Sequence, residues 1–275
     1  MRKLLSAQCS RLLKNKVFWL ELLFMFGMGV YSSLMPYLDN VRYGEHSRVD
    51  DMLFNYIILM GLCMPVFCSL FSGTEYSDGT IRNKLIVGHT RFSVYCSSLL
   101  VSLSASISVA LAFALPYMVL GFSMLEAPKA SAGVLFFMAL LSLFVITAYV
   151  SIFHMLSMLI TKKSTSAVIC MLAFIVLFVL AIVIKGKLDA PEFVQNYSMT
   201  IDGIELMSPE SNPKYLQPEA RRVYQFFFEV LPSGQSLQIA AIDVVHPYLL
   251  MLYSAVTSAA ITVLGIFFFK KKNLK

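Results

Sequence analysis

Charge is scarce in this chain. Only 14% of its 275 residues are Asp, Glu, Lys or Arg, whereas 58% are hydrophobic, and the mean hydropathy is +0.73. A soluble domain carries about 25% charged residues, which it needs to solvate its surface. The shortage of charge therefore excludes a soluble globular domain.

Motifs of catalysis and nucleotide binding are also missing. The sequence has no G-x-x-x-x-G-K-[ST] phosphate loop, no G-x-S-x-G, no H-E-x-x-H and no paired C-x-x-C. The four histidines are scattered, and none of the five cysteines falls in a segment predicted to be external, so no disulfide framework is supported. We expect no enzyme activity and no metal site in this chain.

Long apolar runs are present instead. Several reach about 20 residues, the length that crosses a bilayer as a helix. The alternation of a barrel strand is absent, and a helix satisfies its own backbone in lipid. We therefore predict an all-α, polytopic membrane protein in which residues 1–275 form a single transmembrane domain. The six predicted spans are 17–38, 52–72, 92–122, 131–160, 165–184 and 247–269.

Lysine and arginine gather on one side of these spans. They are concentrated in residues 1–16, in the 73–91 segment, at Lys162 and Lys163, and in the tail from Lys270, whereas most acidic residues fall on the other side. Because cytoplasmic loops are rich in Lys and Arg, both termini and the 73–91 segment are predicted to be cytoplasmic. The net charge of +6 reflects this bias and gives no reason to expect a nucleic-acid partner.

Residues 1–15 are too short and too basic to span a membrane. On a helical wheel their leucines and Cys9 occupy one half, with Lys3 and Lys14 largely opposite. This pattern is typical of a helix lying in the cytoplasmic interface beside anionic lipid headgroups. A basic topology anchor is the alternative. The residues assigned to this interfacial helix are Lys3, Leu4, Leu5, Arg11 and Leu12.

The 73–91 segment is polar, punctuated by glycine and placed between two apolar runs. Asp78-Gly79 is a turn signal, and the hydroxyl of Thr80 can cap a helix that Gly88 would end. These signals predict a short helix, which would cross the cytoplasmic ends of two spans.

The predicted short helix is amphipathic. Ile81 and Leu85 are four residues apart and share a face, while Arg82 and Lys84 point elsewhere. A solvated connecting loop without a partner is the alternative.

The longest external segment is 185–246. It begins with polar sequence and prolines, and residues 219–230 then favour a helix with apolar residues on one face. Pro232 and Gly234 interrupt the pattern, which resumes to about residue 241. Two interpretations stay open: a re-entrant helical hairpin, whose break must be covered by protein, and an ordinary folded external loop.

The run Glu75-Tyr-Ser-Asp-Gly-Thr-Ile-Arg-Asn-Lys-Leu85, followed by Thr90-Arg91 at the start of a span, resembles the coupling-helix motif of type-2 ABC transporter permeases. That family has an acidic residue, Gly-Thr, an aliphatic residue, a leucine and a later Ser/Thr-Arg. The amphipathic N-terminus, the six spans, Leu231-Pro-Ser-Gly-Gln235 and the lysine-rich ending are similar too, so the resemblance covers the whole chain. A lysine often found early in the third span is replaced by Ser97 or Ser98, and no role is carried over there.

The resemblance implies the permease subunit of an ABC exporter in a cell membrane, of bacterial type. Two permeases, identical or related, would pair and bind two separate ATPase subunits, and those ATPases would hold the ATP and magnesium. Ile81 and Leu85 would be apolar knobs entering an ATPase groove, and Glu75 would bond to the interfacial helix or a neighbouring span. The residues assigned to this contact are Glu75, Asp78, Gly79, Thr80, Ile81, Arg82, Lys84, Leu85 and Arg91.

The same resemblance implies alternating access along a dimer axis lined by the second and fifth spans, with an amphipathic or apolar cargo such as a peptide, an antibiotic or a lipid. Asn55, Tyr56, Met60 and Phe67 are the candidate lining residues, chosen for helical spacing on the second span. Packing against neighbouring helices is the alternative for each. Two other functions stay open: a secondary transporter, and a sensor or scaffold that uses 185–246 as its receptor.

Overall fold

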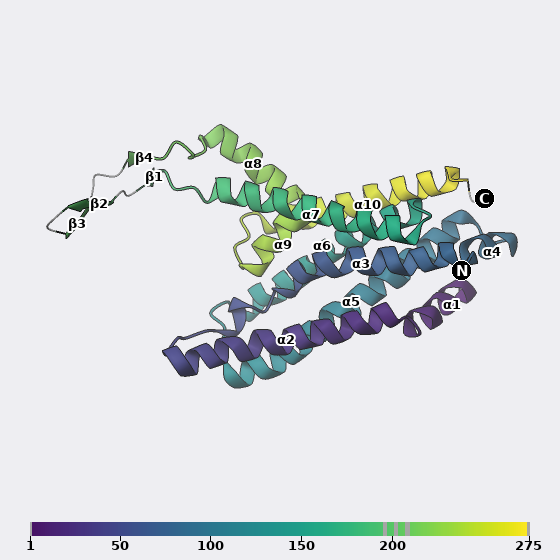
Figure 1. Ribbon diagram of the computed structural model, residues 1–275, viewed down its shortest axis with the longest axis horizontal. Helices are drawn as coiled ribbons and strands as arrows, with labels where there is room; N and C mark the ends of the chain where they lie inside the picture. Colours follow the sequence, from purple (N-terminus) through teal and green to yellow (C-terminus); the bar gives the residue numbers. More distant parts are fainter. Residues whose placement is uncertain (1, 195–196, 201–202, 207–209, 274–275) are drawn as a thin grey trace.

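The computed structural model describes residues 2–194, 197–200, 203–206 and 210–273. Within them, six helices are long and apolar enough to cross a membrane, which confirms the predicted all-α, polytopic membrane fold (Figure 1). These helices are α2 (Lys16–Tyr43), α3 (Tyr56–Ser77), α5 (Arg91–Met124), α6 (Ala132–Leu159), α7 (Lys163–Leu188) and α10 (Pro247–Lys271).

Each predicted span coincides with one of these helices, although several ends lie a few residues further on. Polar caps set some of the boundaries. The Asn15 side chain accepts from the backbone N–H groups of Val17 and Phe18 at 2.9 and 3.1 Å, so α2 starts there. Gly44, with φ of 70°, ends it in the left-handed conformation. The Thr90 hydroxyl caps α5 by accepting from the backbone N–H of Ser93.

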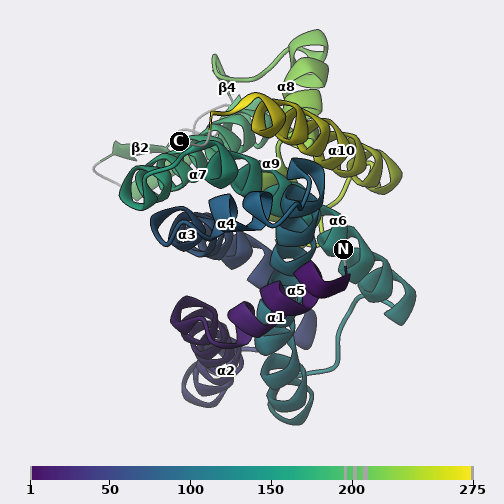
Figure 2. The same ribbon diagram turned by 90° about the vertical axis from the view of Figure 1, so that its right-hand side faces the viewer.

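Helix α3 is the central span. It contacts α5, α6 and α7, while α2 packs along α5 and α10 along α6 (Figure 2). Within the most apolar stretch of each span, 67% of the residues of α3 are buried inside the protein, but only 17% of the residues of α7. Most of the α7 surface is therefore left for lipid or another subunit, whereas α3 can pass a displacement to several neighbours.

Glycine allows two of these helix pairs to approach closely. A Cβ atom built on Gly29 of α2 would lie 2.4 Å from the carbonyl oxygen of Phe113 on α5. One built on Gly265 of α10 would lie 2.1 Å from the hydroxyl oxygen of Tyr95 on α5. Small residues at helix crossings are the usual means of tight packing in membranes.

The two ends of the bundle differ. Helix α1 (Arg2–Leu13), the short helix α4 (Thr80–Ile86) and the C-terminal end of α10 share one end (Figure 1). The opposite end carries the 3-10 helix η1 (Val49–Asp51) and two antiparallel strand pairs. The pairs are β1 (Phe193–Val194) with β4 (Glu210–Ser211), and β2 (Tyr197–Thr200) with β3 (Gly203–Leu206).

A helical hairpin precedes the last span. Helix α8 (Pro218–Val230) matches the helix predicted at 219–230, and α9 (Pro232–Ala240) follows the break at Pro232. Helix α9 packs on α3, α6 and α7, and nearly all of its residues are buried. The break is covered by protein: the Gln235 amide donates to the Glu229 carbonyl, and Gly234 lies against Phe228. Entry of this hairpin into the outer leaflet stays a prediction.

Candidate functional site

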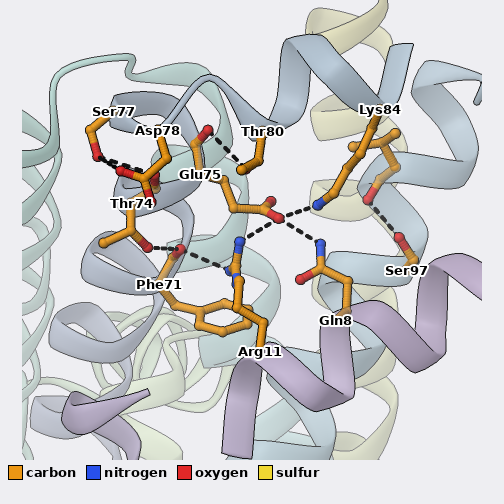
Figure 3. A network of polar contacts seen from close by, with 11 residues as sticks. Gln8, Arg11, Phe71, Thr74, Glu75, Ser77, Asp78, Thr80, Lys84 and Ser97 are labelled. Atoms are coloured by element: carbon orange, nitrogen blue, oxygen red, sulfur yellow. Dashed lines mark hydrogen bonds and ion pairs between the residues drawn. The ribbon is translucent and has the colours of Figure 1, made fainter. Parts of the chain in front are cut away.

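Glu75, near the end of α3, is the centre of the predicted site. Its carboxylate is buried, and a single oxygen, Oε1, contacts three donors. Gln8 donates to it through Nε2 at 2.8 Å, and the cationic groups of Arg11 and Lys84 also contact it. Figure 3 shows these three side chains pointing at the carboxylate from α1 and α4. One acidic group thus joins α1, α3 and α4.

Arg11 strengthens the join between α1 and α3. Its guanidinium donates to the Phe71 carbonyl at 2.9 Å and lies 3.7 Å from the centre of the Phe71 ring. A guanidinium stacked on an aromatic face gains a cation–π attraction as well as its hydrogen bond. Arg11, one of the five residues assigned to the interfacial helix, is therefore fixed by two different contacts.

Helix α1 forms where the interfacial helix is predicted, and its inner face includes a residue that the prediction left out. Leu4 and Leu12 are buried, Leu5 is half-buried and Lys3 is exposed. Gln8 lies between Leu4 and Leu12 at helical spacing and is equally buried. A polar residue in the middle of an apolar stripe is a sequence signal for a buried hydrogen bond, and it could have identified Gln8.

The start of α4 differs from the prediction in one detail. Gly79, with φ of 67°, is the N-cap residue, so the turn at Asp78-Gly79 is confirmed. Thr80 is the first helical residue, and its hydroxyl donates to the Glu75 carbonyl at 3.1 Å instead of capping α4. Gly88, with φ of 97°, lies just beyond the end of the helix, as predicted.

The apolar face of α4 is turned inward, and this corrects the prediction that Ile81 and Leu85 are exposed knobs. Ile81 is 1% exposed within the hydrophobic core, and Leu85 packs against that core. An apolar pair at i, i+4 is buried by the nearest apolar surface, which here is the bundle itself. Ile86 and Val87 are the apolar residues that stay open, at 73% and 79% exposed.

Arg91 connects this site to the last span. Its guanidinium donates to the backbone carbonyls of Phe269, at 3.0 Å, and of Lys270 and Lys272. Cations at a helix C-terminus satisfy carbonyls that have no partner within the helix. The predicted residue Arg91 therefore holds the end of α10 against the start of α5.

Lys272 makes a second connection at the same place. Its ammonium donates to the Tyr76 hydroxyl at 2.9 Å and to the Met158 carbonyl at 3.0 Å. Tyr76 follows Glu75 on α3, so the end of α10 is joined to the residue beside the central carboxylate. The sequence alone does not single out Lys272, because a run of lysines does not indicate which of them is buried.

A cavity of about 450 Å³ opens beside these contacts. The exposed Arg82 is on its wall, together with residues from the end of α3, the start of α4, the turn between α6 and α7 and the segment after α10. Its lining residues are Glu75, Tyr76, Gly79, Ile81, Arg82, Thr161 and Asn273.

The contacts at Glu75 involve more positive than negative groups. Two cations contact one carboxylate, so one positive charge is left over. Burial and the charge of Arg11 together lower the pKa of Lys84 to about 7. Burial lowers the pKa of Arg11 to about 10, although nearby Asp78 acts in the opposite direction, and burial lowers the pKa of Lys272 to about 8. Lys84 is therefore the group that loses its proton first.

The candidate lining residues of α3 pack inside the chain. Met60 and Phe67 are fully buried, and the Tyr56 hydroxyl lies 2.5 Å from the Ser142 hydroxyl of α6. Asn55 is half-buried at the start of α3. These contacts correspond to the packing alternative.

No cluster of three or more His, Cys, Asp or Glu side chains that could hold a metal occurs in the described ranges, and all five cysteines are free. No protein-family model and no curated protein sequence matches this chain. The family assignment therefore stays a proposal.

Proposed function

We propose that this chain is the permease subunit of an ATP-driven exporter of the type-2 ABC kind, with α1, α4 and the chain ends on the cytoplasmic side of a cell membrane. A second permease, identical or related, would complete the transmembrane pathway, and two separate ATPase subunits would dock against α4. The cargo would be amphipathic or apolar, and it would move by alternating access.

The observation that carries this proposal is the junction at Glu75. A seven-residue helix is tethered by an ion pair to the central span, and two open apolar residues lie at its end, Ile86 in its last turn and Val87 just after it. A partner that pushes on α4 would displace α3 through Lys84 and Glu75. Conformational change needs partner contacts that differ between two states, and a rigid connection of this kind would pass that difference from α4 to α3.

The charge distribution supports the orientation. Arg82, Lys270 and Lys271 are exposed at the end of the bundle that carries α4. Basic residues of short loops are retained in the cytoplasm, so an ATPase made in the cytoplasm would meet this end.

The test is co-purification with an ABC ATPase encoded beside the gene, using the double substitution Ile86→Asp and Val87→Asp. Both side chains are exposed, so the fold should persist with an unchanged melting temperature, while ATPase association is lost. The double substitution Phe193→Asp and Val194→Asp is the matched control, because it places the same two charges on exposed apolar residues at the opposite end. Ile81→Asp is unsuitable, because a carboxylate there would disrupt the core.

Undiminished association and cargo-stimulated ATP hydrolysis in the double variant would remove α4 as the docking element. Transport by the purified chain in vesicles without any ATPase would instead favour a secondary transporter. If neither transport nor an ATPase partner is found, the result would favour a sensor or scaffold function.

A further inference from the structure

Glu229, near the end of α8, is a buried carboxylate with one oxygen unused. Only 3% of the residue is exposed. The Gln225 amide donates to Oε1 at 2.8 Å, and Nδ1 of His246 lies 2.8 Å from the same oxygen. The other oxygen, Oε2, keeps accessible surface and has no hydrogen-bond partner among the described residues. Because a buried carboxylate is costly without donors, Oε2 favours a ligand that donates an N–H or O–H to it.

Glu229 lies on the wall of a groove between α8 and α10, which are in contact at the end of the bundle opposite α4 (Figure 2). The groove has a volume of about 610 Å³, within the range of about 300–1,000 Å³ found for ligand pockets. Glu229 supplies the carboxylate among its lining residues, whereas Arg221 and Arg222 supply two guanidinium groups. The groove therefore presents both signs of charge.

Arg222 is a cation without a partner among the described residues. It is exposed and makes no hydrogen bond or ion pair with another of them, whereas Arg221 donates to the Leu188 carbonyl at 2.7 Å. Arg222 precedes Glu229 by seven residues, so the two lie on one side of α8, about 10 Å apart along its axis. A guanidinium is well suited to bind phosphate. One headgroup with a phosphate and a donor could thus reach both residues.

The rest of the groove is largely apolar. Phe226 and Tyr253 form an edge-to-face pair with ring centres 5.8 Å apart, and Leu249 also lies on the wall. Val223 and Phe227, on the same helix as Phe226, are each more than half exposed. Apolar surface left open beside a membrane-spanning helix is favourable in contact with lipid. The groove therefore suits a molecule with a charged head and an apolar tail.

Headgroup chemistry selects among membrane lipids. Phosphatidylethanolamine has a phosphate for Arg222 and a primary ammonium whose N–H groups can donate to Oε2 of Glu229. Phosphatidylcholine has the same phosphate, but its quaternary nitrogen has no N–H to donate. Phosphatidylglycerol has a net negative charge, and a hydroxyl bonds a carboxylate less strongly than an ammonium does. The lipid with the primary ammonium is the one that satisfies both charged groups.

We propose that the groove between α8 and α10 is a binding site for phosphatidylethanolamine, with the ammonium at Glu229, the phosphate at Arg222 and an acyl chain along Phe226 and Tyr253. This site goes beyond the proposed exporter function, because all of its residues belong to this chain and no ATPase is needed to form it. A lipid bound there would contact both the hairpin and the last span.

The test measures lipid binding to the purified full-length chain in dodecyl maltoside by native mass spectrometry. The probes are phosphatidylethanolamine, phosphatidylcholine and phosphatidylglycerol with identical acyl chains. We expect the affinity for phosphatidylethanolamine to be about tenfold higher than that for phosphatidylcholine, the factor that one hydrogen bond to a charged group provides. Phosphatidylglycerol should also bind more weakly than phosphatidylethanolamine.

Two substitutions separate the two contacts. Glu229→Gln removes the carboxylate and should abolish the preference for phosphatidylethanolamine over phosphatidylcholine. Arg222→Gln should weaken binding of both lipids by about tenfold and leave the preference intact, because both carry the phosphate. Arg222 is exposed, so the melting temperature should not change. Lys214→Gln is the matched control, because it removes an exposed cation that lies outside the groove and should bind each lipid as the wild type does.

Equal affinities of the wild type for phosphatidylethanolamine and phosphatidylcholine, or a preference for phosphatidylglycerol, would overturn the proposal. A wild-type preference in folded Glu229→Gln, or undiminished binding by Arg222→Gln, would overturn it too. If Glu229→Gln unfolds through the loss of its bonds to Gln225 and His246, the wild-type comparison and Arg222→Gln still decide. Loss of ATPase docking in the Ile86 and Val87 variant, with lipid binding intact, would count against the exporter function alone.

Discussion

The Nε2 atom of Gln8 lies 2.8 Å from the Oε1 atom of Glu75, and this hydrogen bond joins α1 to α3 across 67 residues of sequence. The same oxygen contacts Arg11 and Lys84. Both partner helices are short, since α1 has 12 residues and α4 has seven. One carboxylate therefore contacts both of these short helices and adds to the apolar contacts that each makes with the core.

The first prediction concerns the charge of Glu75. Glu75→Gln would leave Arg11 and Lys84 without a counter-charge, and we expect a loss of about 3 kcal/mol in the free energy of unfolding, as for a broken buried ion pair. Denaturant titration of the purified protein measures it. Glu126→Gln is the matched control, because Glu126 pairs with His46 and Arg48 at the surface, where a pair contributes less than about 1 kcal/mol. Equal losses in the two variants would contradict the role of Glu75.

The second prediction concerns pH. Burial and Arg11 lower the pKa of Lys84 from 10.5 to about 7, so between these values the unfolded chain binds more protons than the folded one. The free energy of unfolding should therefore rise as pH rises from about 7 towards 10.

Lys84→Met should flatten this rise. Lys272 adds a smaller rise of the same sign, since its pKa is lowered to about 8, and the difference between wild type and variant isolates Lys84. Melting temperatures recorded at closely spaced pH values measure the slope. A slope that is the same in both proteins, or that falls with pH, would show that Glu75 outweighs burial.

The third prediction concerns the α2–α5 contact. In Gly29→Ala the new methyl group would meet the Phe113 carbonyl at 2.4 Å, so the helices must separate, at a cost of about 1–3 kcal/mol. Gly27→Ala, on the same helix, has nothing within 4 Å and should be neutral or slightly stabilising, since alanine favours a helix more than glycine does. Thermal unfolding in detergent compares them. Equal stability of the two variants would mean that the helices do not approach as described.

The fourth prediction concerns topology. In a cysteine-free background, Arg82→Cys should react with a membrane-impermeant maleimide only after the membrane is opened, whereas Ser211→Cys should react in intact cells. Both positions are exposed, so burial does not limit the reaction. The opposite pattern of labelling would reverse the orientation and remove α4 from the reach of a cytoplasmic ATPase.

Hydropathy and turn chemistry predicted much of this fold. The spans, α8, the break at Pro232 and the turn at Gly79 all follow from local sequence, because local patterns determine where a helix starts and ends. The predicted first and second spans stopped too early, since residues such as Arg42 and Glu75 look unfavourable in a helix that crosses lipid. Both residues lie in the last turns of their helices, beyond the apolar stretch.

The site was less predictable, since its contacts join distant segments. The i, i+4 spacing of Ile81 and Leu85 indicates a shared face, but it does not say whether that face turns towards a partner or towards the bundle. Likewise, no local pattern pairs Lys272 with Tyr76. Such contacts depend on how whole helices pack.

The attachment of α10 to Arg91 has a consequence for biosynthesis. Glu75, its partners and Arg91 leave the ribosome early, but the carbonyls that Arg91 binds belong to the last span. Until α10 has been inserted, this end of the protein lacks the hydrogen bonds between Arg91 and α10. The contacts of Arg91 with α10 therefore form only after the rest of the bundle has been made.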